Sequence, residues 1–184
     1  KYVVAKYGGN AMTDPVLKKN VMQDILLLHL IGVNVILVHV GGPDINAMLD
    51  ALKIESHFEN GLRVTDKDTM DVVQMVLAGK VNKGLVAYLS ALGGKAIGLC
   101  GIDGDMIQVH TKNEKLGLVG EIDQIDTTVI DSALSAGFIP VISSVGVDSQ
   151  GQPHNINADT AATKIAAALN AECLVFMSNI DAVM

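Results

Sequence analysis

Short apolar runs alternate with helix-forming segments along this chain of 184 residues, and the alternation constrains the fold more than any other feature. The clearest run is residues 33–39, a near-continuous apolar segment that is typical of a parallel strand buried on both faces. Similar runs predict strands at residues 2–7, 96–100, 138–143 and 172–177. Strands that alternate with helices predict an α/β fold, a three-layer αβα sandwich with a mostly parallel central sheet.

The segments between these runs carry helix start and stop signals. Asp14 and Pro15 provide a cap residue and a first-turn proline, and Gly32 ends the helical pattern. Gly79 is a candidate position for a bend in the longest helix. No linker or internal repeat divides the chain, so residues 1–184 are expected to form a single α/β domain. The other helices are predicted at residues 43–52, 67–92, 127–136 and 157–170.

Three polar sections predict β-hairpins. The first contains Asn60-Gly61, the strongest local signal for a tight hairpin turn. The others span residues 105–122 and residues 147–154. Ligands bind at the carboxyl ends of the strands in open α/β sheets, so we expect the hairpins to protrude there.

Composition and charge exclude several classes of protein. A hydrophobic share of 49% with 18% charged residues excludes intrinsic disorder. The net charge of −7 and the lack of a Lys/Arg run argue against a nucleic-acid partner. The uncharged residues 25–42 contain Gly32 and two histidines, which favours the end of a helix and a buried strand over a membrane span. Cys100 and Cys173 lie in apolar runs without zinc spacing and are expected to be buried free thiols, as in a reducing cytoplasm.

Two glycine turns follow predicted strands and precede predicted helices. Lys6 ends the first strand and is followed by Gly8 and Gly9, while Gly41 and Gly42 follow the next strand. Consecutive backbone amides in such turns form an anion-binding nest, and a lysine adds a cation. Either turn alone also fits an ordinary strand-to-helix connection. Together they predict a shared site for a polyphosphate.

Further polar residues occur at positions suited to binding. Arg63 follows a hairpin turn and suits bidentate binding of a carboxylate, although a surface salt bridge is the ordinary alternative. Asn155, Asn157 and Asp159 alternate before a helix; capping needs only one of them, so three favour a ligand site. His39 is better explained as a packed histidine than as a base. Neither GxGxxG nor GxxxxGK[ST] occurs, which argues against a Rossmann dehydrogenase and a P-loop enzyme.

Four motifs, KYGGNAM, VHVGGP, NGLRVTD and NINADTAA, resemble in this order the amino-acid kinase family, and within it the branch that phosphorylates N-acetyl-L-glutamate. The segments GKVNK, GLCGIDG and LGLVGEI are similar to the same branch, so the resemblance covers the whole chain. It implies transfer of the γ-phosphoryl group of ATP, with Mg²⁺, to the side-chain carboxylate of N-acetyl-L-glutamate in arginine biosynthesis. It also implies a cytoplasmic homodimer or larger homo-oligomer without a membrane partner. The apolar helix at residues 67–92 is the expected dimer surface.

The resemblance also implies a role for each matching residue. Lys6 would stabilise charge on the transferring phosphoryl group, and Asp159 would hold Lys6 in place. The implied binding residues are Gly41, Gly42, Arg63 and Asn155 for the amino-acid substrate, and Lys6, Gly8, Gly9, Ser178 and Asp181 for ATP.

The chain departs from the family pattern at two places. Val40 stands where the family has a glycine, and its side chain would crowd the turn if the turn needs a positive φ. The chain also stops soon after Asp181, so it is expected to comprise the amino-acid-substrate lobe and the beginning of the nucleotide lobe, truncated on the C-terminal side and poorly active alone. Two alternatives stay open: another amino-acid kinase such as glutamate 5-kinase, and a non-catalytic ligand-binding fragment.

Overall fold

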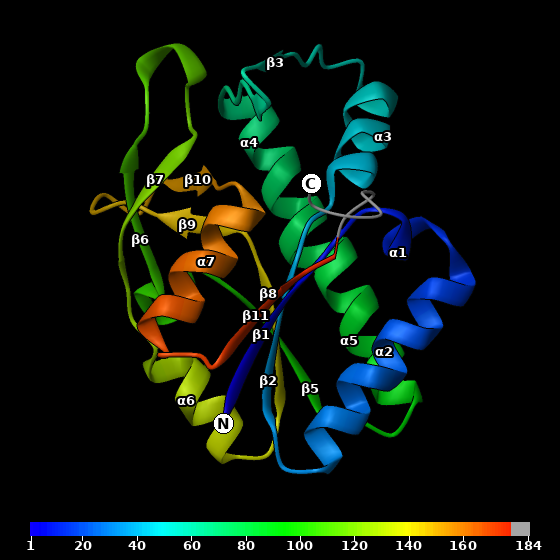
Figure 1. Ribbon diagram of the computed structural model, residues 1–184. Coiled ribbons are helices and arrows are strands. Elements are labelled where there is room, and N and C mark those ends of the chain that lie inside the picture. The colour runs from blue at the N-terminus through cyan, green and yellow to red at the C-terminus, as the bar shows by residue number, and fades with distance from the viewer. Residues whose placement is uncertain (178–184) are drawn as a thin grey trace, which may run out of the picture.

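Within residues 1–177, the main sheet has five parallel strands in the order β11-β1-β2-β8-β5. The computed structural model describes residues 1–177 (Figure 1). Each strand corresponds to an apolar run predicted from the sequence. Their bounds are Tyr2–Tyr7 for β1, Asn34–His39 for β2, Ala96–Cys100 for β5, Ile139–Ser143 for β8 and Cys173–Phe176 for β11.

Helices lie on both faces of this sheet, which confirms the three-layer sandwich. Figure 1 shows α2 and α5 on one side of the strands and α6 and α7 on the other. The bounds are Asn10–Thr13 for α1, Pro15–Leu30 for α2, Gly42–Leu52 for α3, Lys67–Gln74 for α4, Asn82–Ala91 for α5, Thr128–Ser135 for α6 and Ala158–Ala168 for α7, with short 3₁₀ turns at Asp103–Asp105 and Glu114–Leu116.

Strand β2 shows why a central strand must be apolar throughout. Val35 and Leu37 belong to the core beneath α2 and α5, whereas Ile36 and Val38 belong to the core beneath α6 and α7. Successive side chains of a strand point to opposite faces, so a strand covered on both faces buries every side chain. All four of these residues are fully buried.

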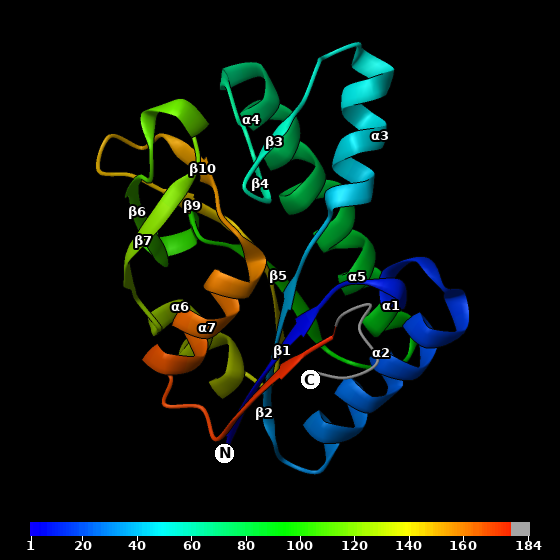
Figure 2. The ribbon, with the colours of Figure 1, turned by 45° about the horizontal axis from the view of Figure 1, so that its top comes forward.

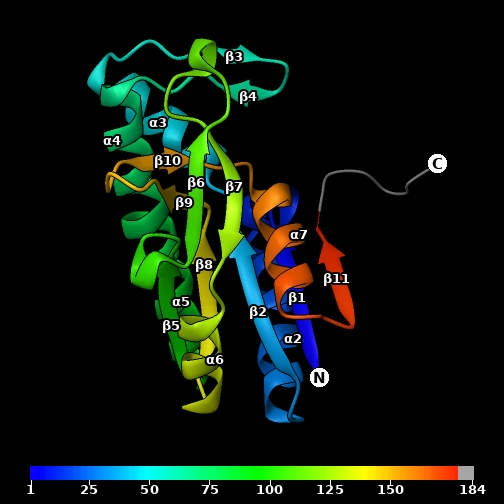
Figure 3. The same ribbon diagram turned by 90° about the vertical axis from the view of Figure 1, so that its left-hand side faces the viewer.

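The predicted hairpins are present, and two of them join into a second sheet. Strands β6 (Ile107–Thr111) and β7 (Gly120–Ile125) pair antiparallel, as do β9 (Val145–Val147) and β10 (Pro153–Asn155). A parallel contact between β6 and β9 produces the order β10-β9-β6-β7, seen from the side in Figure 3. The sequence predicted both hairpins but not that they pair with each other to form one sheet.

The third hairpin joins β3 (Phe58–Glu59) to β4 (Leu62–Arg63). Asn60 and Gly61 both have positive φ, 49° and 79°, as the tight turn requires. Figure 2 shows this hairpin at the same end of the molecule as α3 and α4. This is also the end at which β1 and β2 finish.

The helix predicted over residues 67–92 is not a uniform α-helix. A π-helical segment, Met75–Val81, separates α4 from α5, and Gly79 lies within it. Asn82 directly after this segment packs against the sheet at Gly98, where an added Cβ would lie 1.9 Å from the Asn82 Oδ1 atom. A π-helical insertion changes which side chains of a helix face a neighbouring sheet, and such insertions are frequent at functional sites.

The prediction for the two cysteines was half right. Cys100 is buried, but Cys173 is exposed. The reason is that Cys173 begins β11, the edge strand of the sheet in residues 1–177, which pairs only with β1 there. An apolar run therefore identified the strand but not its position in the sheet.

The uncharged stretch of residues 25–42 is divided between the end of α2, strand β2 and the glycine loop that follows. None of the helices in residues 1–177 combines the length and the apolar character that a membrane span needs.

Candidate functional site

The two glycine loops lie side by side because they follow neighbouring parallel strands. The Val40 amide donates to the Tyr7 carbonyl at 3.1 Å, which joins the loops directly. Gly9 has a φ of 65°, a left-handed conformation that favours glycine. A Cβ on Gly8 would lie 3.0 Å from Lys6 Nζ and 3.1 Å from Val40 Cγ2. Gly8 therefore lets the first loop pass close to both the lysine and the second loop.

Lys6 contacts Asp159, as the resemblance to the family implied. The Nζ atom lies 3.0 Å from Asp159 Oδ1; the lysine side chain is 11% exposed and the aspartate side chain 57% exposed. Asp159 lies in the first turn of α7, so this contact ties β1 to that helix. An ion pair with one exposed partner adds little stability. Its effect is to fix the direction of the lysine ammonium beside the first glycine loop.

The second glycine loop needs glycine for space rather than for backbone freedom. Gly41 has a φ of −165°, an extended value that any residue adopts. An added Cβ there would lie 2.6 Å from Leu77 Cδ2 of the π-helical segment. Val40 is not among the residues with positive φ, so the predicted crowding at this position does not arise. A Cβ on Gly42, the first residue of α3, would meet no atom within 4 Å.

Arg63 is buried and is not part of a surface salt bridge. Its two terminal nitrogens donate to Ser56 Oγ at 2.7 Å and Asn46 Oδ1 at 2.6 Å. The guanidinium also stacks on the Phe58 ring, 4.6 Å from its centroid. No carboxylate of residues 1–177 forms an ion pair with it, and burial lowers its pKa from the usual value. A buried cation held only by neutral groups favours binding of an anion.

One pocket brings together four residues predicted to bind the substrate: Gly41, Gly42, Arg63 and Asn155. This central pocket has a volume of about 180 Å³. Within residues 1–177, Arg63 is the one charged side chain that lines it. The pocket thus combines a single cation with amide groups and admits a small molecule rather than a polymer.

Two further polar residues, Ser144 and Asn157, line the central pocket. Sequence reasoning missed Ser144, although its place directly after strand β8 is a signal that it lies at the ligand-binding edge of the sheet. Asn157 was predicted to cap a helix or to face a ligand, and in the structure it caps α7 and also lines the pocket. Its Oδ1 accepts from the Thr160 amide at 3.0 Å, and the residue lines the pocket.

Two helices begin at the central pocket. Gly41 and Gly42 start α3, while Asn157 and Ala158 start α7, and all four residues line the pocket. The N-terminus of a helix carries a partial positive charge and amide groups without an intrahelical acceptor. Both helix starts therefore favour an anion in the same place as Arg63.

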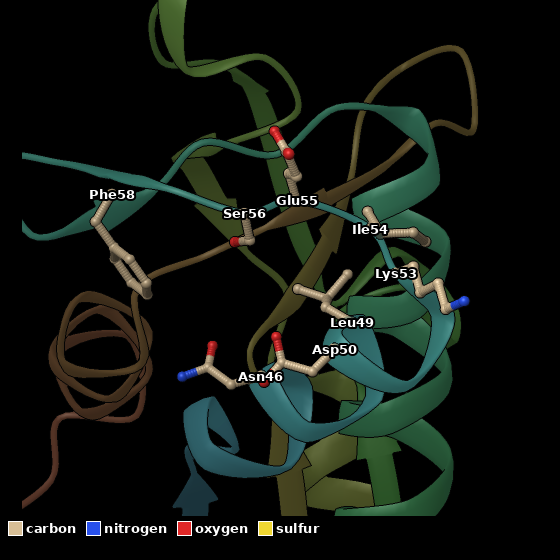
Figure 4. Close-up of a pocket in the computed structure, with 8 residues that line it drawn as sticks. All are labelled: Asn46, Leu49, Asp50, Lys53, Ile54, Glu55, Ser56 and Phe58. Carbon is tan, nitrogen blue, oxygen red and sulfur yellow. The ribbon is translucent and has the colours of Figure 1, made fainter.

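A larger hollow lies beside this pocket, on the other side of the groups that hold Arg63. Figure 4 shows this outer hollow, of about 730 Å³, between the end of α3 and the segment that leads to β3. Asn46 and Ser56 line it and also bond Arg63. Its charged side chains have mixed sign: Asp50, Lys53 and Glu55. The outer hollow therefore lacks the uniform preference for anions that the central pocket has.

His39 ends β2 and is fully buried, which confirms the prediction of a packed histidine. Its Nδ1 lies 3.0 Å from the Val40 carbonyl oxygen, and its Nε2 lies 3.2 Å from Asn82 Nδ2. Burial lowers the pKa of His39 to about 4, against a smaller opposing effect of the bond to Val40. The imidazole is therefore neutral at pH 7.

This histidine is expected to make the fold sensitive to acid. The unfolded chain binds a proton near the ordinary pKa of 6.5, whereas the folded chain resists it down to about 4. The contribution of His39 to the free energy of unfolding is therefore fully present above pH 6.5. It is lost as the pH drops from 6.5 towards 4, by about 1.4 kcal/mol per pH unit for one proton. Urea unfolding at several pH values should show this slope reduced in His39→Gln. The exposed His57→Gln should keep it, and an unchanged slope in His39→Gln would contradict the assignment.

Ser178 and Asp181, predicted to bind ATP, lie outside the described residues. In residues 1–177 no three His, Cys, Asp or Glu side chains form a group that could hold a metal ion.

The sequence model of the Amino acid kinase family matches residues 1–184, and the chain belongs to that family. Its similar curated relatives include acetylglutamate kinases of Brachyspira hyodysenteriae, 52% identical over 97% of this chain, and Haemophilus ducreyi, 57% identical over 98% of it. The chain spans 63% of the length of each of these relatives. The crystal structure of a Streptococcus mutans protein superposes with a TM-score of 0.92 at 32% identity, covering 100% of this chain and 74% of that one.

Proposed function

We propose that this chain is the substrate-binding part of an acetylglutamate kinase, together with the beginning of its nucleotide lobe. The reaction joins a side-chain carboxylate oxygen of N-acetyl-L-glutamate to the γ-phosphorus of ATP and releases ADP and an acyl phosphate. The observation that carries the proposal is Arg63, a buried cation without a carboxylate partner in residues 1–177, in a pocket shared with Gly41, Gly42 and Asn155. Relatives at 52% and 57% identity support the choice of substrate.

Substrate binding follows from the lining of the central pocket. Arg63 donates to the α-carboxylate, the group that its fork of donors fits. Asn155 is a donor and acceptor for the polar groups of the substrate, and its Nδ2 already donates to Thr65 Oγ1 at 3.3 Å. The amides of Gly41 and Gly42 lie between the substrate and the phosphates. Each donor is placed before the ligand arrives, which lowers the entropy cost of binding.

Phosphoryl transfer needs charge neutralisation and alignment rather than a covalent intermediate. Lys6 stabilises the negative charge on the transferring group, and Asp159 directs its ammonium through the 3.0 Å contact. Gly8 and Gly9 donate amides to the phosphates of ATP. Mg²⁺ enters with ATP as part of the substrate complex, and Ser178 and Asp181 belong to the nucleotide site.

A panel of substrates tests this function. We expect N-acetyl-L-glutamate to bind to the chain and free L-glutamate to bind far more weakly, because the relatives that the chain matches at 52% and 57% identity are acetylglutamate kinases. Titration calorimetry measures both affinities, and a coupled assay measures ADP release. Preference for free glutamate would indicate another amino-acid kinase. Binding of N-acetyl-L-glutamate without turnover in the complete protein would indicate a binding module.

We also propose that the protein forms a homodimer or a larger homo-oligomer. The apolar composition of residues 67–92 is not the support for this, since Met70, Val73, Val76 and other side chains of that segment are buried in the core of their own chain. The support is the resemblance to the family. Light scattering during gel filtration measures the mass in solution and decides between a monomer and an oligomer.

A further inference from the structure

A buried polar contact beneath the second glycine loop takes no part in the roles described above. Asn82 begins α5 directly after the π-helical segment and is fully buried. Its Nδ2 donates to the Val141 carbonyl at 2.9 Å and to the Leu99 carbonyl at 3.3 Å, and it lies 3.2 Å from His39 Nε2. One amide group thus bridges three neighbouring strands, β5, β8 and β2, near the ends from which the site loops leave.

The neighbours determine which way the Asn82 amide points. Two backbone carbonyls can only accept, so Nδ2 must face them. The Lys83 ammonium can only donate, and its Nζ lies 3.2 Å from Asn82 Oδ1. Gly98 provides the space, because an added Cβ would lie 1.9 Å from that oxygen. The orientation of the amide is therefore fixed from both sides.

The same reasoning fixes the tautomer of His39. The Val40 carbonyl, 3.0 Å from Nδ1, can only accept, so Nδ1 carries the hydrogen. Nε2 must then accept from Asn82 Nδ2, which has two hydrogens: one bonds the Val141 carbonyl at 2.9 Å, and the other is shared between His39 Nε2 at 3.2 Å and the Leu99 carbonyl at 3.3 Å. A chain of hydrogen bonds thus leads from Asn82 through the imidazole to the first peptide of the second glycine loop.

The π-helical segment contacts the next residue of that loop. A Cβ on Gly41 would lie 2.6 Å from Leu77 Cδ2 and 3.3 Å from Val81 Cγ2. The loop is therefore packed by the π-helical segment at Gly41 and held through His39 at Val40. Both contacts come from one irregular helix, in which Leu77 and Val81 of the π-helical segment meet the loop and Asn82, the first residue of α5, meets the sheet.

We propose that Asn82 is a positioning residue of the anion site: it holds His39 in one tautomer and orientation, and His39 fixes the Val40 carbonyl so that the Gly41 and Gly42 amides face the pocket. The identity of the bound anion in this inference rests on the proposed function, whereas the conformation of the loop does not. The alternative is a purely structural role, in which Asn82 ties β5 to β8 through their carbonyls.

A double-mutant cycle separates these two roles. Asn82→Ala should weaken binding of N-acetyl-L-glutamate about tenfold to a hundredfold, the range expected when buried partners lose a hydrogen bond. In His39→Asn, the new side-chain amide can still donate to the Val40 carbonyl. It places no acceptor at the position of Nε2, which faces Asn82 in the wild type. In the His39→Asn background, Asn82→Ala should have little further effect, because both changes break the same chain. Calorimetry measures all four affinities.

Nuclear magnetic resonance gives a second readout that a structural role would not change. The wild-type His39 imidazole should show a protonated Nδ1 and an unprotonated Nε2. Asn82→Ala should alter that pattern and shift the Gly41 and Gly42 amide resonances. Ser143→Ala is the matched control, since Ser143 is the neighbour of His39 across the β2/β8 pair and its hydroxyl lies 3.5 Å from the same Leu99 carbonyl, but that hydroxyl forms no hydrogen bond with His39 in residues 1–177. It should leave the protonation pattern of the His39 imidazole unchanged.

Additive effects in the cycle, or unchanged glycine amides in Asn82→Ala, would overturn the proposal. If Asn82→Ala does not fold, the tautomer of His39 in the wild type tests the proposal instead, because a protonated Nε2 on His39 is incompatible with the chain of hydrogen bonds. If the wild type does not bind N-acetyl-L-glutamate, the proposed function is wrong, and the resonance experiment still tests the positioning role.

Discussion

In the complete enzyme, replacing Lys6 with alanine is expected to lower kcat by about 10²–10³-fold with little change in KM, because this is the usual effect of removing one donor that stabilises charge in the transition state. Lys6 Nζ lies beside the first glycine loop and is directed by Asp159 at 3.0 Å. A cation at this place acts on the charge that develops on the transferring phosphoryl group. The measurement is the rate of ADP release at saturating N-acetyl-L-glutamate and ATP.

Lys95→Ala is the control for this experiment. Lys95 is exposed and precedes β5, at the amino ends of the parallel strands and so at the edge opposite the site. The Lys95→Ala substitution removes the same charge without changing the glycine loops, so kcat should stay unchanged. A Lys6→Ala enzyme that keeps the wild-type kcat would exclude the proposed role of Lys6.

Replacing Arg63 with alanine should abolish most of the affinity for N-acetyl-L-glutamate. Removing one partner of a buried charge pair costs about 2–5 kcal/mol, and so binding should weaken by about thirtyfold or more. Arg63→Lys should recover only part of the loss, since an ammonium keeps the charge but not the planar fork of donors. Calorimetry measures the affinities, and thermal unfolding checks that each variant folds.

Lys53→Gln is the matched control for Arg63. Lys53 is a cation of the outer hollow in Figure 4, next to the groups that hold Arg63 but outside the central pocket. If the substrate binds in the central pocket, Lys53→Gln should leave its affinity unchanged. A loss of affinity in Lys53→Gln, with none in Arg63→Ala, would place the substrate in the outer hollow instead.

The sheet and the loops could be predicted because their signals are local. The apolar residues 33–39 correspond to β2 at Asn34–His39, and Asn60-Gly61 forms the predicted turn. The meeting of Lys6 with Asp159 was implied by the resemblance to the family, because Asp159 follows β10 of the second sheet rather than a parallel strand. The spacing of residues along the chain was sufficient for the strand and the turn but not for this pair.

The features that could not be predicted depend on contacts between distant segments. The π-helical segment is followed directly by Asn82, which bonds the carbonyls of β5 and β8, and residues 67–92 alone carry no sign of those partners. A glycine inside an apolar strand, Gly98, was the available signal, since such a glycine often marks the close approach of another group. Ser144 was missed for the same reason: its role depends on the position of β8 between β2 and β5.

A titration of the ¹⁵N-labelled chain with N-acetyl-L-glutamate, followed by nuclear magnetic resonance, tests directly whether the substrate binds in the central pocket. We expect the largest shifts at the Gly41 and Gly42 amides, the Arg63 side chain and the Asn155 side chain, while the resonance of Gly151 at a distant turn does not move. Shifts confined to Lys53 and Glu55 in the outer hollow, or no shifts at saturating ligand, would contradict it.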